Sequence, residues 1–267
     1  MEILGYVASV LIGISLGMVG SGGSILTVPV LVYLMNIEPL LATTSSLFIV
    51  GTTSLVGGLR AYSKKLVDFR AITEFGIPSI FSIFITRHYI LPALPDNMFS
   101  VGTIHVSKSM FLMVVFAILM LVASFTMIRN HDNEQKTVES EAARQGKVLP
   151  LVILGILIGF VTGLLGAGGG FLIIPSLVLF LRLPMKTAVG TSLLIIAINS
   201  LFGFLFSLKQ FEYNWVILVV FTILAIAGIF IGSRLADKIP GASLKKGFGW
   251  FILVMAIYII IKEVFLK

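Results

Sequence analysis

Eight apolar stretches account for most of the chain, and each has the length of a helix. They cover residues 3–34, 40–59, 71–91, 110–128, 148–181, 188–208, 215–235 and 248–261. A helix needs about 20 apolar residues to cross the hydrocarbon core of a bilayer. Because lipid offers no partner to an unpaired backbone group, only helices and closed barrels cross it, and the alternation typical of barrel strands is absent here. The sequence therefore predicts an all-α polytopic membrane protein.

The composition argues against most other classes of protein. Hydrophobic residues make up 58% of the chain and charged residues 12%, whereas soluble domains contain about 25% charged residues. A soluble enzyme, a nucleic-acid-binding protein or a disordered chain would need far more polar surface. The net charge of +7 comes from basic residues at the ends of the apolar stretches, which suits lipid headgroups, so the expected partner is the bilayer and not nucleic acid.

Two of the stretches, 3–34 and 148–181, are too long for one crossing, and glycine clusters interrupt both. The clusters are Gly20-Ser21-Gly22-Gly23 and Gly166-Ala167-Gly168-Gly169-Gly170. Glycine costs about 1 kcal/mol in a helix interior and tolerates positive φ. Each stretch is therefore predicted to form a helix, a non-helical glycine turn and a second helix.

The two interrupted stretches are also copies of each other. A shift of 146 residues carries glycines, a proline and small polar residues of the first onto identical residues of the second. The matching pairs are Gly13/Gly159, Gly17/Gly163, Gly20/Gly166, Gly22/Gly168, Gly23/Gly169, Pro29/Pro175, Ala42/Ala188, Ser46/Ser192, Ser54/Ser200 and Gly57/Gly203. With a small insertion before His105, the last helix of each half also corresponds. We predict two homologous transmembrane repeats, 1–128 and 148–267, joined by a polar linker, 129–147, whose mixed charges are typical of a solvated segment.

The orientation of the repeats depends on whether each interrupted stretch returns to the side where it began. If it does, the halves are inverted, and five of the 19 Lys and Arg residues lie on one side and the rest on the other. The five are Arg87, Lys108, Lys209, Lys262 and Lys267. The positive-inside rule favours this hairpin, with both termini outside and the linker in the cytoplasm. A single crossing with parallel repeats, or a re-entrant second arm, is the alternative.

The glycine breaks are the first candidate site. Broken helices at corresponding positions of a duplicated membrane protein point to a transport site near the midplane. The helix that restarts after a break presents free N–H groups and a partial positive charge, which bind anion oxygens without a buried Lys or Arg. The candidate residues are Ser21, Gly22, Gly23, Ser24, Ala167, Gly168, Gly169 and Gly170. For Gly13, Gly17, Gly159 and Gly163, the four-residue spacing favours close helix packing instead.

Hydroxyl groups follow both breaks at equivalent places. They are Ser45 and Ser46 in the first half and Thr191 and Ser192 in the second. Such groups can donate to an anion, but in lipid they also bond to carbonyls of their own helix. Asn199 is an amide inside an apolar stretch, which favours either a ligand role or a helix–helix hydrogen bond.

Charged residues are absent from the centres of the apolar stretches, so a carboxylate proton relay is not expected. Arg87, Arg182 and Arg234 lie at the ends of stretches, where arginine usually extends to the interface. The three histidines show no metal-ligand spacing, and no catalytic motif is present. We expect no metal, no cofactor and no enzymatic activity.

The doubled glycine clusters, each followed by Pro29 or Pro175, resemble the paired signature of the sulfite exporter TauE/SafE family. The segments Ala42–Leu47 and Ala188–Leu193 resemble the second repeated element of that family. The resemblance covers essentially the whole chain and implies a prokaryotic-type inner-membrane permease for sulfur-containing anions such as sulfite, thiosulfate and organosulfonates. It places the glycine loops and the four hydroxyls along the substrate path. The chain departs from its own repeat at Ser24/Gly170 and at Thr44/Gly190.

These observations predict a permease that moves a small sulfur oxyanion by alternating access, with hydroxyls from both halves completing the coordination. An anion channel and a non-transporting membrane scaffold are the alternatives. A proton or sodium coupling ion and a homo-oligomeric assembly are compatible with the sequence, which specifies neither.

Overall fold

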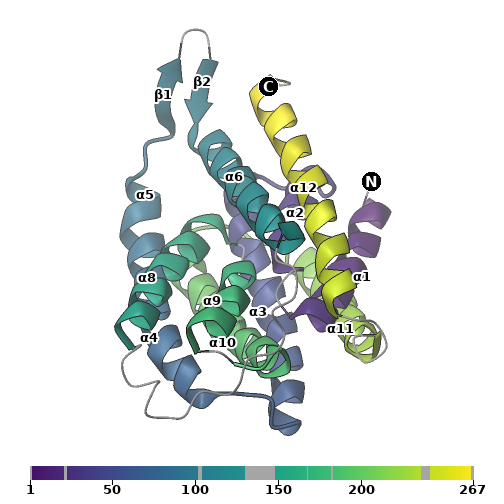
Figure 1. Cartoon of the computed structure of the whole chain (residues 1–267). Helices are drawn as coiled ribbons and strands as arrows, with labels where there is room; N and C mark the ends of the chain where they lie inside the picture. The colour runs from purple at the N-terminus through teal and green to yellow at the C-terminus, as the bar shows by residue number, and fades with distance from the viewer. Residues whose placement is uncertain are drawn as a thin grey trace.

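The computed structural model describes residues 2–20, 23–101, 104–129, 148–166, 168–181, 183–235 and 241–265. The described part is almost entirely helical (Figure 1). Its principal helices are α1 (Glu2–Val19), α2 (Ser24–Tyr33), α3 (Pro39–Ser63), α4 (Phe69–Ile85), α6 (Lys108–Arg129), α8 (Val148–Leu165), α9 (Gly170–Leu181), α10 (Met185–Ser207), α11 (Trp215–Leu235) and α12 (Gly241–Phe265). Five segments of this described part are long and apolar enough to cross a membrane: 39–63, 69–93, 108–125, 185–207 and 215–235. The all-α polytopic class is therefore confirmed.

One segment, residues 86–107, was not predicted to have the structure that it has. After α4, a π-helical turn η1 (Thr86–Ile90) and a short helix α5 (Leu91–Ala93) lead into strands β1 (Asn97–Val101) and β2 (Ile104–Ser107). The strands pair antiparallel, with Ser100 opposite His105. This hairpin lies where the predicted repeat requires an insertion, before α6, and it projects beyond the helices at the top of Figure 1.

Helices α3 and α10 pack against each other in opposite directions. A Cβ added at Gly51 would lie 3.0 Å from Cγ of Leu201, and one added at Gly58 would lie 2.5 Å from Cδ2 of Leu194. Seven residues forward along α3 therefore correspond to seven residues back along α10. This register defines two ends of the bundle. The "basic end" contains the turn between α3 and α4 and the start of α10, and the "hairpin end" contains the start of α3, the end of α10 and the β-hairpin.

Each glycine-interrupted stretch returns to the end where it began. Helix α1 runs parallel to α11, because Gly13 faces Ala225 and Gly17 faces Ile229. It therefore ends at the basic end, and α2 leads back to the start of α3. Helix α8 runs parallel to α4, with Gly159 facing Ser79, and α9 leads back to the start of α10. The predicted helical hairpins are thus present in both places.

The small residues of α1 and α8 mediate close helix packing. A Cβ added to Gly13 would lie 2.9 Å from Cα of Ala225. One added to Gly159 would lie 2.8 Å from Cα of Ser79, and one added to Gly163 would lie 2.7 Å from Cβ of Thr86. The packing interpretation of these glycines is confirmed. The first helix of each predicted half also packs against the fourth principal helix of the other predicted half: α1 against α11, and α8 against α4. An inverted pair would show this exchange, although the duplication itself stays a prediction.

Candidate functional site

The second glycine break lies against both central helices. Gly166, Gly168 and Gly169 have φ values of 67°, 67° and 65°, a region that side chains other than glycine rarely adopt. A Cβ at Gly166 would overlap the carbonyl oxygen of Thr43 on α3, and one at Gly168 would lie 3.2 Å from Oγ of Ser200 on α10. Both the backbone conformation and the close approach therefore require glycine. Gly170, which is buried, is the first residue of α9.

The first break is placed in the same way against the opposite helix. Gly20 has a φ of 78°, and a Cβ there would overlap the side chain of Val189 on α10. Val189 and Thr43 are themselves related by the shift of 146 residues, so each break contacts the corresponding turn of the other half. Buried Ser24 begins α2, and the residue at its N-cap is Gly23, which has no side chain to cap the helix. Three of the predicted site residues, Ser21, Gly22 and Ala167, lie outside the described part of the chain.

The two hydroxyl pairs lie at opposite ends of the bundle. Ser45 lines a small, mostly apolar pocket at the hairpin end, together with Asn214. On the α3–α10 register Thr191 is level with Ala61, sixteen residues beyond Ser45, which corresponds to about 24 Å along the helix. The structure therefore does not bring the two pairs together around one small ligand.

Three of the hydroxyls have defined structural partners. Ser46 Oγ donates to the carbonyl oxygen of Gly166 and so ties the second break to α3. Ser192 Oγ donates to the Val189 carbonyl of its own helix at 2.8 Å. Thr191 Oγ1 accepts from the backbone N–H of Asp68 at 2.9 Å.

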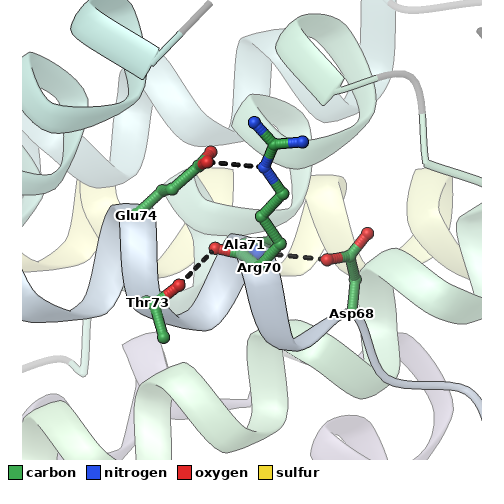
Figure 2. Close-up of polar contacts among 5 residues, drawn as sticks. All are labelled: Asp68, Arg70, Ala71, Thr73 and Glu74. Carbon is green, nitrogen blue, oxygen red and sulfur yellow. Dashed lines mark hydrogen bonds and ion pairs between the residues drawn. The ribbon is translucent and has the colours of Figure 1, made fainter. Parts of the chain in front are cut away.

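The contact at Thr191 docks the start of α4 onto α10. The Asp68 carboxylate accepts from the N–H of Ala71 at 3.0 Å and caps α4, while Arg70 and Glu74 form an ion pair of 2.6 Å on the next turn (Figure 2). A Cβ at Gly190 would overlap the Leu66 carbonyl oxygen of the same turn. The departure from the repeat at Gly190 therefore has a packing reason.

The middle of the α3–α10 pair contains a group of buried polar side chains, which we call the central polar group. It consists of Thr53 and Ser54 on α3 and Asn199 and Ser200 on α10, all fully buried. Asn199 Oδ1 accepts from Ser79 Oγ of α4 at 2.8 Å, so the predicted helix–helix hydrogen bond exists. Asn199 Nδ2 and the hydroxyls of the other three have no hydrogen-bond partner among the described residues.

Register explains why these four residues lie in the middle. Gly51 faces Leu201, so Thr53 is level with Asn199, and the two are also related by the shift of 146 residues. Gly168 of the second break lies beside Ser200, and a Cβ added to Gly168 would lie 3.0 Å from Cγ1 of Val50. Sequence reasoning selected Asn199 and missed Thr53, Ser54 and Ser200, although the matched Ser54/Ser200 pair was a usable signal.

Arg87 was predicted to extend to the interface, and this prediction is wrong. The residue lies in η1 at the hairpin end and is 0% exposed. Its Nη1 donates to Thr44 Oγ1 at 2.8 Å and lies 3.5 Å from Ser207 Oγ, while Nε and Nη2 have no partner in the described chain. A π-helical turn inserts an extra residue and redirects the side chains that follow, which explains the inward orientation. Arg234 is exposed as predicted, and Arg182 lies outside the described residues.

The loop after α10 covers the Arg87 site. Gln210 Nε2 donates to the Arg87 carbonyl oxygen at 3.4 Å, and the Tyr213 hydroxyl donates to the Ser207 carbonyl oxygen at 3.0 Å. Burial raises the pKa of Tyr213 to about 12, against the opposite effect of the Arg87 charge. The phenol therefore stays protonated and keeps its donor.

Two returning helical hairpins, each broken by glycines beside buried polar groups, define a polytopic membrane protein with discontinuous helices. A family model described as "Sulfite exporter TauE/SafE" matches residues 6–259. The chain therefore belongs to the TauE/SafE family of membrane transporters, and the resemblance inferred from the glycine motifs is confirmed.

Curated relatives agree with this assignment. The chain is 28% identical over 256 residues to a "Probable membrane transporter protein" of Xylella fastidiosa (strain Temecula1), covering 94% of this chain and 91% of the relative. It is 27% identical over 274 residues to the "Probable membrane transporter protein YunE" of Bacillus subtilis (strain 168), covering 97% and 95%. No solved structure gives a significant match. The names of these relatives specify transport across a membrane and no substrate.

Proposed function

We propose that this protein moves small sulfur-containing oxyanions, such as sulfite, thiosulfate and sulfoacetate or other organosulfonates, across the inner membrane by alternating access. The observation that carries the proposal is the central polar group beside Gly168. An unpaired donor in a lipid-surrounded interior costs several kcal/mol. Donors in the middle of the bundle that have no partner among the described residues are therefore best explained by a transported ligand or its water.

The chemistry of these groups suits an oxyanion. Hydroxyls and the Asn199 amide nitrogen donate hydrogen bonds, and the nearby N-terminus of α9 adds a partial positive charge. Sulfite, thiosulfate and sulfonates all present several acceptor oxygens on one sulfur atom. No carboxylate of the described residues belongs to the central polar group, so an inorganic cation would find only neutral oxygens there.

The hairpins supply the moving parts of the proposed mechanism. The first break contacts α10 near the basic end, through Gly20 and Val189, and the second contacts α3 at the hairpin end, through Gly166 and Thr43. A shift of one hairpin against the central pair would open the path to one end and leave the other end closed. The positive φ values at the breaks make these turns the natural hinges.

Uptake into proteoliposomes tests this function. We expect saturable flux of labelled sulfite, thiosulfate or sulfoacetate, with competition between the anions. Thr53→Val, which removes a hydroxyl of the central polar group, should reduce this flux about tenfold, as the loss of one buried hydrogen bond predicts. The matched control is Thr73→Val, because Thr73 is exposed and donates only to the Arg70 carbonyl of its own helix (Figure 2).

Three results would contradict the proposal. Flux of a cation without flux of any of the three anions would exclude sulfur-anion transport. Currents that do not saturate and exceed carrier turnover would favour the anion channel. A protein that moves no solute at all would be the membrane scaffold.

The distribution of basic residues predicts the orientation. Arg60, Lys64, Lys65, Arg70, Lys186 and Arg234 lie at the basic end, which should face the cytoplasm. Because the chain has no cysteine, single cysteines report sidedness directly. We expect Lys209→Cys at the hairpin end to react with a membrane-impermeant maleimide in intact cells, and Lys64→Cys to react only after permeabilisation. Both positions are exposed, and the reverse labelling pattern would overturn the assignment.

A further inference from the structure

We propose that Arg87, Thr44 and Ser207 form a second anion site at the hairpin end, which takes one small oxyanion on the free edge of the guanidinium. This inference rests on the proposed function, because it names the charged group that the transported anion meets on its path. The site is distinct from the central polar group. Thr44 lies nine residues before Thr53 on α3, about 13 Å along the helix.

The free donors of Arg87 have the geometry of a bidentate site. Nε and Nη2 carry the two hydrogens on one side of the planar guanidinium, and both lack a partner among the described residues. This edge matches two oxygens of a carboxylate, phosphate or sulfonate group. Nη1 is held by Thr44 at 2.8 Å, so the guanidinium is already oriented.

The charge of Arg87 also has no counter-ion within the part of the chain that the structure describes. The residue is 0% exposed, and no Asp or Glu of the described chain forms an ion pair with it. Burial of an unpaired charge is among the most unfavourable arrangements in a protein. A bound oxyanion would supply both the missing charge and the missing acceptors.

The fold itself does not require this arrangement. A shift of 146 residues relates Arg87 to Ser233, Thr44 to Gly190 and Ser207 to Ala61. At the equivalent place in the other predicted half, α11 continues as a regular helix, and Ser233 accepts a hydrogen bond from Arg60 of α3, which is only partly buried. Helices are thus joined there without a fully buried guanidinium, so the complete burial of Arg87 favours a ligand role.

Equilibrium binding to the purified full chain in detergent tests the site. With labelled sulfite and thiosulfate at constant ionic strength, we expect Arg87→Gln to weaken binding about 100-fold, because two charge-assisted hydrogen bonds are lost. Arg87→Lys should bind with intermediate affinity, since it keeps the charge and loses the planar edge. Arg60→Gln is the matched control, because Arg60 contacts Ser233 at the basic end and should leave binding unchanged.

The outcomes separate this site from the proposed function. Binding of both anions by Arg87→Gln with wild-type affinity would overturn the site, even where wild-type vesicles show flux. If Arg87→Gln does not fold, Thr44→Val is measured in its place. Wild-type affinity in both Thr44→Val and Arg87→Lys would then overturn the site. Tight binding lost in Arg87→Gln, combined with no flux in wild-type vesicles, would support the site and refute the transport of these anions.

Discussion

Alanine at position 166 is expected to unfold the second helical hairpin and to lower the stability of the whole protein by several kcal/mol. Gly166 has a φ of 67°, which costs an L residue about 1–2 kcal/mol. The added Cβ would also overlap the carbonyl oxygen of Thr43. That atom belongs to the backbone of α3 and cannot rotate away, so the break must move and the hydrogen bond from Ser46 must be lost. The melting temperature and the monodisperse fraction in detergent measure the effect.

A second glycine provides the control for this substitution. Gly76 is buried inside α4, and a Cβ there would lie 3.9 Å from Cγ2 of Ile72, at an ordinary contact distance. Gly76→Ala should be neutral or stabilise the protein by up to about 1 kcal/mol, the difference in helix propensity. Equal melting temperatures for Gly166→Ala and Gly76→Ala would show that the break is not held by the contacts described.

The helices and the breaks could be predicted because their causes are local. Apolar length decides a membrane helix, and clustered glycines interrupt one, so α1–α2 and α8–α9 follow from stretches 3–34 and 148–181. The β-hairpin was missed because its strands hold only nine residues, Asn97–Val101 and Ile104–Ser107. Strands this short give a weak periodic signal beside helices of 20 or more residues.

The site could be predicted only in part, because its geometry depends on helix direction. The repeat identified equivalent residues such as Ser45 and Thr191, but equivalent positions on antiparallel helices separate toward opposite ends. Only positions near the crossing point can meet, and the register places Thr53 and Asn199 there. A periodic pattern in the sequence specifies which residues correspond and does not specify where two helices cross.

Arg87 shows a second limit of the same kind. Its position near the end of stretch 71–91 is typical of an arginine that reaches the interface. The π-helical turn η1 and the hydroxyls of Thr44 and Ser207, from two other helices, decide that it points inward. These partners are 43 and 120 residues away in the sequence, so no local pattern contains them.

The substitution Arg87→Met is expected to stabilise the protein in the absence of anion and to reduce sulfur-anion flux about 100-fold. The side chain is 0% exposed, and two of its three nitrogens have no partner among the residues that the structure describes. Replacing buried charges with apolar groups of similar size is often neutral or stabilising by about 1–4 kcal/mol. Thr44 would not be left unsatisfied, because its hydroxyl also lies 3.3 Å from the Leu40 carbonyl oxygen. Thermal unfolding without anion, followed by flux in vesicles, measures the two effects separately.

The two measurements distinguish a binding residue from a structural one. An arginine that only joins α3, η1 and α10 would lower the melting temperature when replaced, and flux would fall no further than the loss of folded protein explains. An arginine kept for an anion lowers stability until the anion binds, because the cost of its burial is offset only by the ligand. Arg60→Met serves as the comparison, since Arg60 is partly exposed and lies 5.7 Å from the Phe230 ring centroid. Arg60→Met should lower the melting temperature slightly and leave flux unchanged. A rise in melting temperature together with a loss of flux in Arg87→Met alone would therefore support an anion at Arg87.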